Sequence, residues 1–193
     1  LLDSDDPVSR RLLEKCTFFL VPNVNIDGSI HGNLRSNAGG VNLNREWGNP
    51  SPVKSPEVYF IMQKMNETGV DLFLDIHGDE AIPYCFVSGI EGLPGYHGRL
   101  QMLQERFVEL WETISPDFQT KHGYPKSEPG KANLNIAAKA VAHRFDCLGL
   151  TIEMPFKDNA DLPDRAFGWS PERSIKLGES VLNIILQLEQ VLR

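Results

Sequence analysis

Continuous apolar runs alternate with amphipathic stretches along this 193-residue chain, and the two kinds of stretch predict different elements. Apolar runs bounded by polar residues or glycine are typical of strands buried within a helix-covered sheet. They predict strands at 17–23, 70–76, 83–88 and 147–153. Helical spacing and capping residues predict helices at 7–16, 55–68, 97–114, 132–145 and 170–192. The segments 24–52 and 115–131 have neither pattern and are expected to be loops.

Strands that alternate with helices indicate the α/β class. We therefore expect a mixed, mostly parallel sheet with helices on both faces, in a single domain that comprises residues 1–193. We expect the long asparagine- and glycine-rich segment 24–52 to take part in function, because structureless loops of this length are uncommon in compact domains.

The composition narrows the function classes. A net charge of −7 argues against a nucleic-acid-binding surface. No apolar run approaches the roughly 20 residues of a membrane span, and no secretory leader is visible, so we expect a cytoplasmic protein with no membrane partner. The odd number of cysteines, each in or beside an apolar run, favours free thiols over disulfides.

Two predicted strands end on residues that can carry chemistry. His77 follows the apolar run 70–76 and has Asp75, Asp79 and Glu80 as neighbours, any of which could hold its second ring nitrogen. Glu153 closes the run 147–153, where a glutamate is rarely buried without a partner. Ligands in open α/β sheets bind at the carboxyl ends of strands, so a metal-binding imidazole and a general base are the functional interpretation. A structural histidine and a solvent-facing glutamate are the alternatives.

The glycine-rich loop adds groups that bind anions. Asn44 and Arg45 suit a carboxylate clamp, because a guanidinium holds a carboxylate through two parallel hydrogen bonds. Arg35 could instead stabilise an oxyanion. Tyr124 lies in the loop segment 122–125 and is a candidate to close over substrate, with an ordinary surface aromatic residue as the alternative.

These residues lie in motifs that resemble those of the zinc metallocarboxypeptidases. The resemblance is closest to the cytosolic carboxypeptidase branch, especially its bacterial members. Its motifs are NVNIDG at 23–28, NLR at 33–35, GVNLNREW at 40–47, DIHG at 75–78 and TIEMPF at 151–156. They occur in the order of the family and cover most of the chain.

The resemblance implies a role for each position. His77 would be a zinc ligand, and Glu153 the general base that deprotonates zinc-bound water and passes the proton to the leaving amine. Arg35 would stabilise the oxyanion, while Asn44 and Arg45 would bind the terminal carboxylate of the substrate. The substrate would be the C-terminus of a peptide or protein, and Tyr124 would be the family's mobile tyrosine.

The sequence departs from the family in one respect. A zinc site of this family also needs a His-x-x-Glu pair on an early loop, and the chain has no such pair. Because it begins at Leu1 without methionine, we expect an excerpt that lacks an upstream segment with this pair and an N-terminal β-rich domain. One zinc ion per full-length chain is then expected, with the remaining ligands outside this sequence.

The identity of the substrate side chain is left open by the sequence. The cytosolic branch often removes acidic residues, and Lys131 and Lys139 lie near the expected specificity pocket. Two alternative functions are kept. One is an N-acyl amino acid deacylase of related fold, such as an aspartoacylase-like hydrolase, and the other is a non-catalytic module that binds C-termini.

Overall fold

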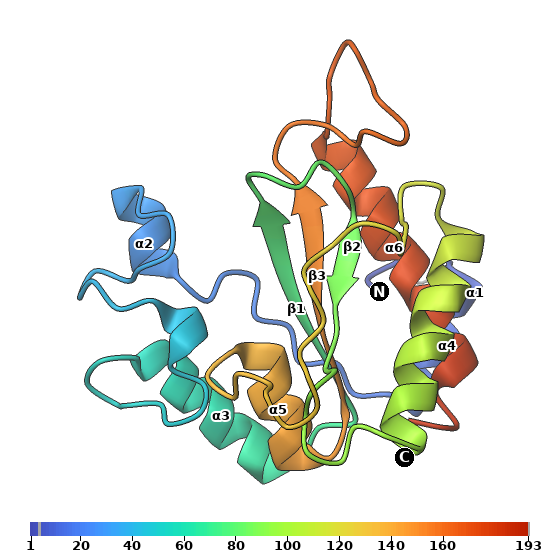
Figure 1. The fold of residues 1–193 in the computed structure, drawn as a ribbon. Helices are drawn as coiled ribbons and strands as arrows, with labels where there is room; N and C mark the ends of the chain where they lie inside the picture. Colours follow the sequence, from blue (N-terminus) through green and yellow to red (C-terminus); the bar gives the residue numbers. More distant parts are fainter. Residues whose placement is uncertain (4, 193) are drawn as a thin grey trace.

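The computed structural model describes residues 1–3 and 5–192 and consists of a small sheet between two groups of helices (Figure 1). The helices and strands, in chain order, are α1 (Pro7–Lys15), α2 (Ile26–His31), the 3-10 helix η1 (Leu43–Arg45), α3 (Pro56–Thr68), β1 (Leu72–Asp79), β2 (Phe86–Ser88), α4 (Arg99–Ile114), α5 (Ala137–Phe145), β3 (Leu148–Pro155) and α6 (Pro171–Leu188).

The sheet has the strand order β1-β3-β2. β1 runs parallel to β3, and the short β2 runs antiparallel to it, so the sheet is mixed. β3 lies at the centre, and its residues are buried on both faces except Met154. This burial explains why the sequence of β3 is a continuous apolar run rather than an alternating one.

Helices cover both faces of the sheet, as the alternation of elements predicted. On one face, α1, α4 and α6 pack with Leu148, Leu150 and Ile152 of β3 in the larger apolar cluster. On the other face, α3 and α5 form a smaller cluster with Phe73 of β1 and with Trp47 (Figure 1). The α/β fold with helices on both faces is confirmed.

The prediction of a strand at 17–23 was wrong. This segment leads from α1 to α2 without forming a strand, and Phe19, Leu20 and Val21 are each more than half exposed. A strand requires a hydrogen-bonded neighbour, and the described part of the chain gives none to these residues. The apolar segment 17–23 therefore has no strand beside it to pair with in the described part of the chain.

Several element boundaries also differ from the sequence interpretation. The loop 24–52 contains α2, which begins where Asn25 Oδ1 accepts the amide hydrogen of Gly28 and ends at the left-handed Gly32. The helix predicted from residue 132 begins at 137, and the strand predicted from residue 83 begins at 86. β1 and β3 extend to 79 and 155, so His77 and Glu153 lie inside the strands rather than after them.

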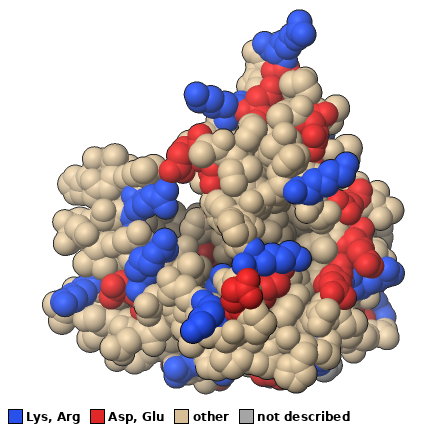
Figure 2. Space-filling model, viewed as in Figure 1, with Lys and Arg blue, Asp and Glu red and all other residues tan. Residues whose placement is uncertain are grey.

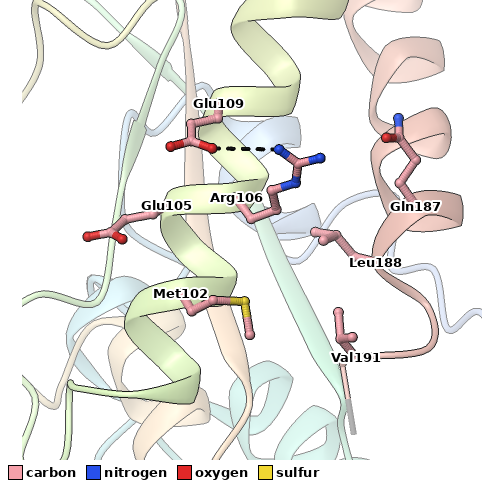
Figure 3. Close-up of a pocket in the computed structure, with 7 residues that line it drawn as sticks. All are labelled: Met102, Glu105, Arg106, Glu109, Gln187, Leu188 and Val191. Atoms are coloured by element: carbon pink, nitrogen blue, oxygen red, sulfur yellow. Dashed lines mark ion pairs between the residues drawn. The ribbon is translucent and has the colours of Figure 1, made fainter.

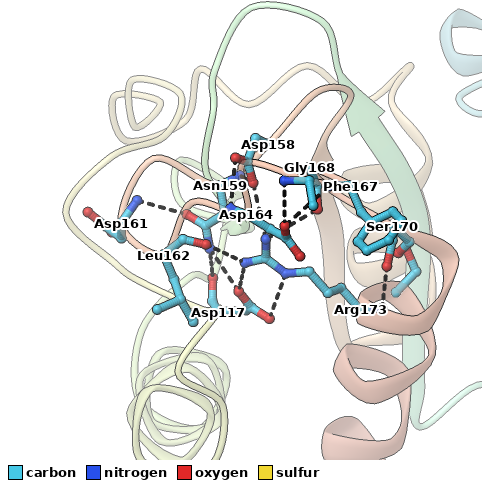
Figure 4. Close-up of polar contacts among 12 residues, drawn as sticks. Asp117, Asp158, Asn159, Asp161, Leu162, Asp164, Phe167, Gly168, Ser170 and Arg173 are labelled. Carbon is cyan, nitrogen blue, oxygen red and sulfur yellow. Dashed lines mark hydrogen bonds and ion pairs between the residues drawn. The ribbon is translucent and has the colours of Figure 1, made fainter.

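A polar network fastens the loop that follows β3 to the start of α6 (Figure 4). The Arg173 guanidinium pairs with Asp117 and, at 3.1 Å, with Asp158. The fully buried Asn159 donates to the carbonyl oxygen of Asp117 at 2.9 Å. The Trp169 ring lies 4.8 Å from the Arg173 guanidinium carbon. Loop 156–170 is therefore held by partly buried charges, although it has no regular structure.

An open groove lies on the surface of the helical layer that α4 and α6 form. It lies between α4 and the end of α6 (Figure 3), and its lining residues are Met102, Glu105, Arg106, Glu109, Gln187, Leu188 and Val191. The pair between Arg106 and Glu109 within this groove is exposed. Among the described residues, no helix combines the length and hydropathy needed to cross a membrane.

Candidate active site

The site lies on the face of the sheet that α3 and α5 cover only in part. Side chains alternate between the two faces of a strand, so Phe73, Asp75, His77 and Asp79 share this face of β1. The first of these, Phe73, packs 5.7 Å from the ring of Trp47. The three polar residues follow toward the carboxyl end of the strand. One face of β1 thus begins in an apolar cluster and ends in a polar site.

His77 and Glu153 are directly paired positions of the parallel strands β1 and β3. Their side chains therefore leave the same face of the sheet at neighbouring positions. The sequence interpretation that placed an imidazole and a carboxylate in a common site agrees with this register.

Glu153 is held in an environment that disfavours its charge. The residue is 5% exposed, and its Oε2 atom is buried with no hydrogen-bond partner among the described residues. Burial raises the pKa of Glu153 to about 7, although the charge of His77 and the hydrogen bond with Tyr124 act in the opposite direction. A carboxyl group with this pKa can both take up and release a proton near neutral pH.

The three carboxylates near His77 each have a different partner. Asp75 Oδ2 lies 2.8 Å from His77 Nε2, so Asp75 is the residue that orients the imidazole. Burial lowers the pKa of His77, but the hydrogen bond and charge of Asp75 outweigh this effect and the net direction is upward. Glu80 pairs instead with Arg35. Asp79 accepts the hydroxyl proton of Tyr124.

Arg35 lies at the same end of the sheet. Its Nη2 atom is 2.8 Å from Glu80 Oε1, and both side chains are about half exposed. The positive charge of Arg35 lowers the pKa of both His77 and Asp79, which indicates that it is close to them. The guanidinium is thus near the site but is engaged with Glu80.

Asn44 and Arg45 belong to η1, whose first turn is closed by Asn42 Oδ1 accepting the Asn44 amide hydrogen at 3.1 Å. Asn44 Oδ1 accepts the amide hydrogen of Ala137 at 2.9 Å, which fixes η1 to the start of α5. The exposed Arg45 donates to the carbonyl oxygen of Asn44 at 2.6 Å. No carboxylate of residues 1–3 or 5–192 forms an ion pair with Arg45, so most of its donors are available to a ligand.

The surface near the middle of this face is hollowed, and lysine and arginine side chains lie on both sides of the hollow (Figure 2). The protein as a whole carries a net charge of −7. Acidic side chains also lie beside this hollow, so its surface is mixed in charge (Figure 2).

Tyr124 comes from the loop between α4 and α5. Its hydroxyl lies 2.5 Å from Asp79 Oδ2 and 3.3 Å from Glu153 Oε1, and its ring meets Phe86 edge-on at 5.0 Å. The side chain is 44% exposed. Tyr124 therefore lies in the same site as Glu153. Its hydrogen bond to Asp79 had not been predicted from the sequence. The alternation of Asp75, His77 and Asp79 could have placed Asp79 on the strand face of His77, but not its contact with Tyr124.

The two lysines considered for the specificity pocket differ in their surroundings. Lys131 is exposed. Lys139, on α5, is partly buried and donates to Ser127 Oγ at 3.1 Å, and burial lowers the pKa of its ammonium group.

The described residues alone do not complete a zinc site. Residues 1–3 and 5–192 contain no group of three His, Cys, Asp or Glu side chains arranged to hold a metal ion. A catalytic zinc ion normally has three protein ligands. His77, oriented by Asp75, fits one ligand of such a set, and Glu153 with its unsatisfied oxygen fits a neighbouring base.

Comparison with known proteins agrees with these features. The family model for zinc carboxypeptidase matches residues 1–177. A solved structure of a metallo-carboxypeptidase from Pseudomonas aeruginosa, in complex with (2-guanidinoethylmercapto)succinic acid, is 53% identical, with a TM-score of 0.96 over 99% of this chain and 51% of that one.

Two curated relatives are also similar. An uncharacterised protein of Zymomonas mobilis is 46% identical over 97% of this chain and 50% of its own length. Cytosolic carboxypeptidase 6 of Caenorhabditis elegans is 24% identical over 80% of this chain and 35% of its own length. The chain thus spans at most about half the length of the relatives it matches. By the extent of the family match, this chain belongs to the zinc carboxypeptidase family.

Proposed function

We propose that this chain carries the proton-transfer and substrate-binding residues of a zinc carboxypeptidase that removes the last residue from the C-terminus of a peptide or protein. The observation that supports this most strongly is the pairing of His77 with Glu153, whose buried Oε2 atom has no hydrogen-bond partner among the described residues. A buried carboxylate oxygen of this kind is costly unless a ligand or water completes it.

Glu153 would act as the general base and then as the general acid. Its pKa of about 7 suits both steps, since the ideal catalytic pKa lies near the working pH. The carboxylate would take a proton from the attacking water and deliver it to the amine that leaves. Glu153 is only 5% exposed, which would limit the access of bulk water to that proton.

Asn44 and Arg45 would bind the terminal carboxylate of the substrate. The guanidinium of Arg45 is exposed and pairs with no carboxylate in the described part of the chain. Because the Oδ1 atom of Asn44 is used by Ala137, its amide N–H groups are the part left for a ligand. The (2-guanidinoethylmercapto)succinic acid bound by the Pseudomonas aeruginosa enzyme is a dicarboxylate, which supports a carboxylate subsite here.

Arg35 would stabilise the oxyanion that forms when water adds to the scissile carbonyl group. This role requires Arg35 to leave Glu80, and the pair that it leaves is exposed. Exposed ion pairs are worth roughly 0–1 kcal/mol, so a developing negative charge could compete for the guanidinium. Arg35 would therefore change partners between the free and the reacting enzyme.

Zinc, when bound, would lower the pKa of a water molecule and polarise the carbonyl group. His77 would supply one ligand, and we propose that the other two come from a His-x-x-Glu pair in a segment that precedes Leu1, together with a separate β-rich domain. A cytoplasmic location would accompany this architecture.

An acidic C-terminal residue is the preferred substrate under this proposal. The partly buried Lys139 has no carboxylate within ion-pair distance among the described residues and lies on the helix that Asn44 contacts. Its ammonium group would then pair with the substrate side chain. Replacing Lys139 with Met should lower kcat/KM for peptides that end in Glu but not for peptides that end in Leu; an equal loss for both would oppose this preference.

The reaction class is tested with the full-length, zinc-loaded protein and three substrates. These are a peptide with a free C-terminus, the same peptide as its C-terminal amide, and an N-acetyl amino acid. We expect release of the last residue from the free peptide only. Preferential deacylation of the N-acetyl amino acid would instead indicate a deacylase, and peptide binding without turnover, unaffected by chelators, would indicate a binding module.

A further inference from the structure

Asp79 closes β1 and is 7% exposed, so its carboxylate is fixed by its surroundings. Its Oδ1 atom accepts two amide hydrogens, from Ala81 at 2.7 Å and from Ile82 at 2.6 Å. Its backbone carbonyl accepts the amide hydrogen of Phe156, at the end of β3. The two amide hydrogens of the following turn thus orient the side chain, and the bond with Phe156 fixes its backbone.

The second oxygen of Asp79 is directed at Tyr124. The Tyr124 hydroxyl lies 2.5 Å from Asp79 Oδ2 and 3.3 Å from Glu153 Oε1. A hydroxyl group has one proton to donate. Both acceptors are carboxylates, and the shorter contact, to Asp79, is the stronger hydrogen bond, while the contact to Glu153 is the longer and weaker one.

The loop that carries Tyr124 is held on both sides of this residue, because the His122 ring stacks on Tyr84 at 4.2 Å and Lys139 donates to Ser127 Oγ. Gly123 lies against Phe86 so closely that a Cβ atom would be 3.0 Å from the Phe86 ring, and the Tyr124 ring meets Phe86 edge-on. Gln119 holds the base of the loop by donating to the carbonyl oxygen of Cys85 at 3.1 Å. These contacts restrain the ring, and among residues 1–3 and 5–192 the hydroxyl hydrogen-bonds only to Asp79 and Glu153.

We propose that Asp79 is a positioning residue that holds the Tyr124 hydroxyl beside Glu153 by taking the shorter of its two hydrogen bonds. This inference rests on the proposed function, because it assigns Asp79 to the same reaction. It leaves Tyr124 with only the longer, weaker contact to the general base. A tyrosine without such a partner would donate its proton to Glu153 and compete with the proton that the base must transfer.

The test uses the full-length, zinc-loaded protein with Asp79→Asn, Tyr124→Phe and the double variant. Asparagine keeps the oxygen that caps the Ala81 turn but removes the charged acceptor. We expect each single variant to lower kcat/KM about tenfold, which is the loss of one charge-assisted hydrogen bond. The double variant should be no slower than the slower single variant, because both changes remove the same interaction.

Amide hydrogen exchange supplies a readout that does not depend on turnover. Exchange in segment 119–131 should be several-fold faster in both single variants than in the wild type. Asp164→Asn is the matched control, because Asp164 Oδ1 caps Ala166 and Phe167 in the same pattern but contacts no tyrosine. This control should leave both exchange in 119–131 and kcat/KM unchanged.

Additive losses in the double variant, or unchanged exchange in Tyr124→Phe, would overturn the role of Asp79. The second result decides the question even where Asp79→Asn fails to fold. If the wild-type protein releases no C-terminal residue, the proposed function fails, whereas faster exchange in the variants still supports the hydrogen bond that positions Tyr124.

Discussion

His77 and Glu153 stand opposite each other in the register of β1 and β3, and their side chains leave the same face of the sheet. Residues 76 positions apart in sequence therefore share one site through a single strand pairing. The pairing lies at the carboxyl ends of the two strands, where α/β proteins bind their ligands. Under the proposed function, His77 would hold a metal ion while its neighbour Glu153 transfers a proton.

Replacing His77 with Ala should remove most of the bound zinc from the full-length protein. Three ligands normally hold a catalytic zinc ion, so the loss of one should reduce the content from about one ion per chain to a small fraction. Metal analysis after dialysis measures this directly. His143→Ala, an exposed residue on α5, is the control and should keep its zinc. Full retention in the His77 variant would remove this residue from the metal site.

Replacing Arg45 with Ala should weaken substrate binding far more than it slows turnover. The guanidinium would hold the terminal carboxylate in both the ground state and the transition state, so KM should rise at least about tenfold with kcat little changed. Arg45→Lys should recover only part of the loss, since an ammonium group cannot make the bidentate contact. Steady-state kinetics with a free-acid peptide checks this, and an unchanged KM would contradict the clamp.

Stability should depend on pH through Glu153. The folded state raises its pKa from 4.5 to about 7, so the folded protein binds this proton more tightly than the unfolded chain. The stabilisation from this proton is complete below pH 4.5 and is lost as the pH rises through about 7.

Glu153→Gln removes this dependence in the metal-free protein. Relative to the wild type, the free energy of unfolding of the variant should increase by about 1–3 kcal/mol between roughly pH 5 and pH 8. Denaturant titrations at the two pH values measure the change. A stability difference that does not vary with pH would show that Glu153 is not held with a raised pKa.

Replacing Arg173 with Ala should destabilise the fold by about 3 kcal/mol, because it leaves the carboxylates of Asp117 and Asp158 unpaired in a mostly buried network. Arg11→Ala breaks an exposed pair with Glu14 and should cost less than about 0.5 kcal/mol. Chemical denaturation of both variants tests the contrast. Equal, small losses would mean that the network does not hold the loop after β3.

The sequence pattern was sufficient to predict the layers of the fold and to place His77 and Glu153 near each other. The apolar run of β3 and the amphipathic spacing of α4 and α6 follow from burial alone, and burial leaves a periodic trace in a sequence. The motifs around His77 and Glu153 could be assigned because each closes such a run. The prediction of a strand at 17–23 was wrong because it relied on hydrophobicity alone. Hydrophobicity does not reveal whether a neighbouring strand exists to pair with the segment.

The contacts among side chains could not be read from the sequence. Three carboxylates near His77 were equivalent candidates for its partner, and only the fold assigns Asp75 to His77, Glu80 to Arg35 and Asp79 to Tyr124. Strand alternation could exclude Glu80 from the face that carries His77. It could not choose between the other two, because that choice depends on where the loop with Tyr124 lies.

The central claim is that Glu153 transfers the proton in peptide hydrolysis, and the most direct measurement is the kcat of Glu153→Gln in the full-length, zinc-loaded protein. We expect kcat to fall at least about 100-fold while the Kd for (2-guanidinoethylmercapto)succinic acid stays near the wild-type value. Glu179→Gln, an exposed position on α6, should leave both values unchanged. A Glu153→Gln protein that turns over at close to the wild-type rate would contradict the account.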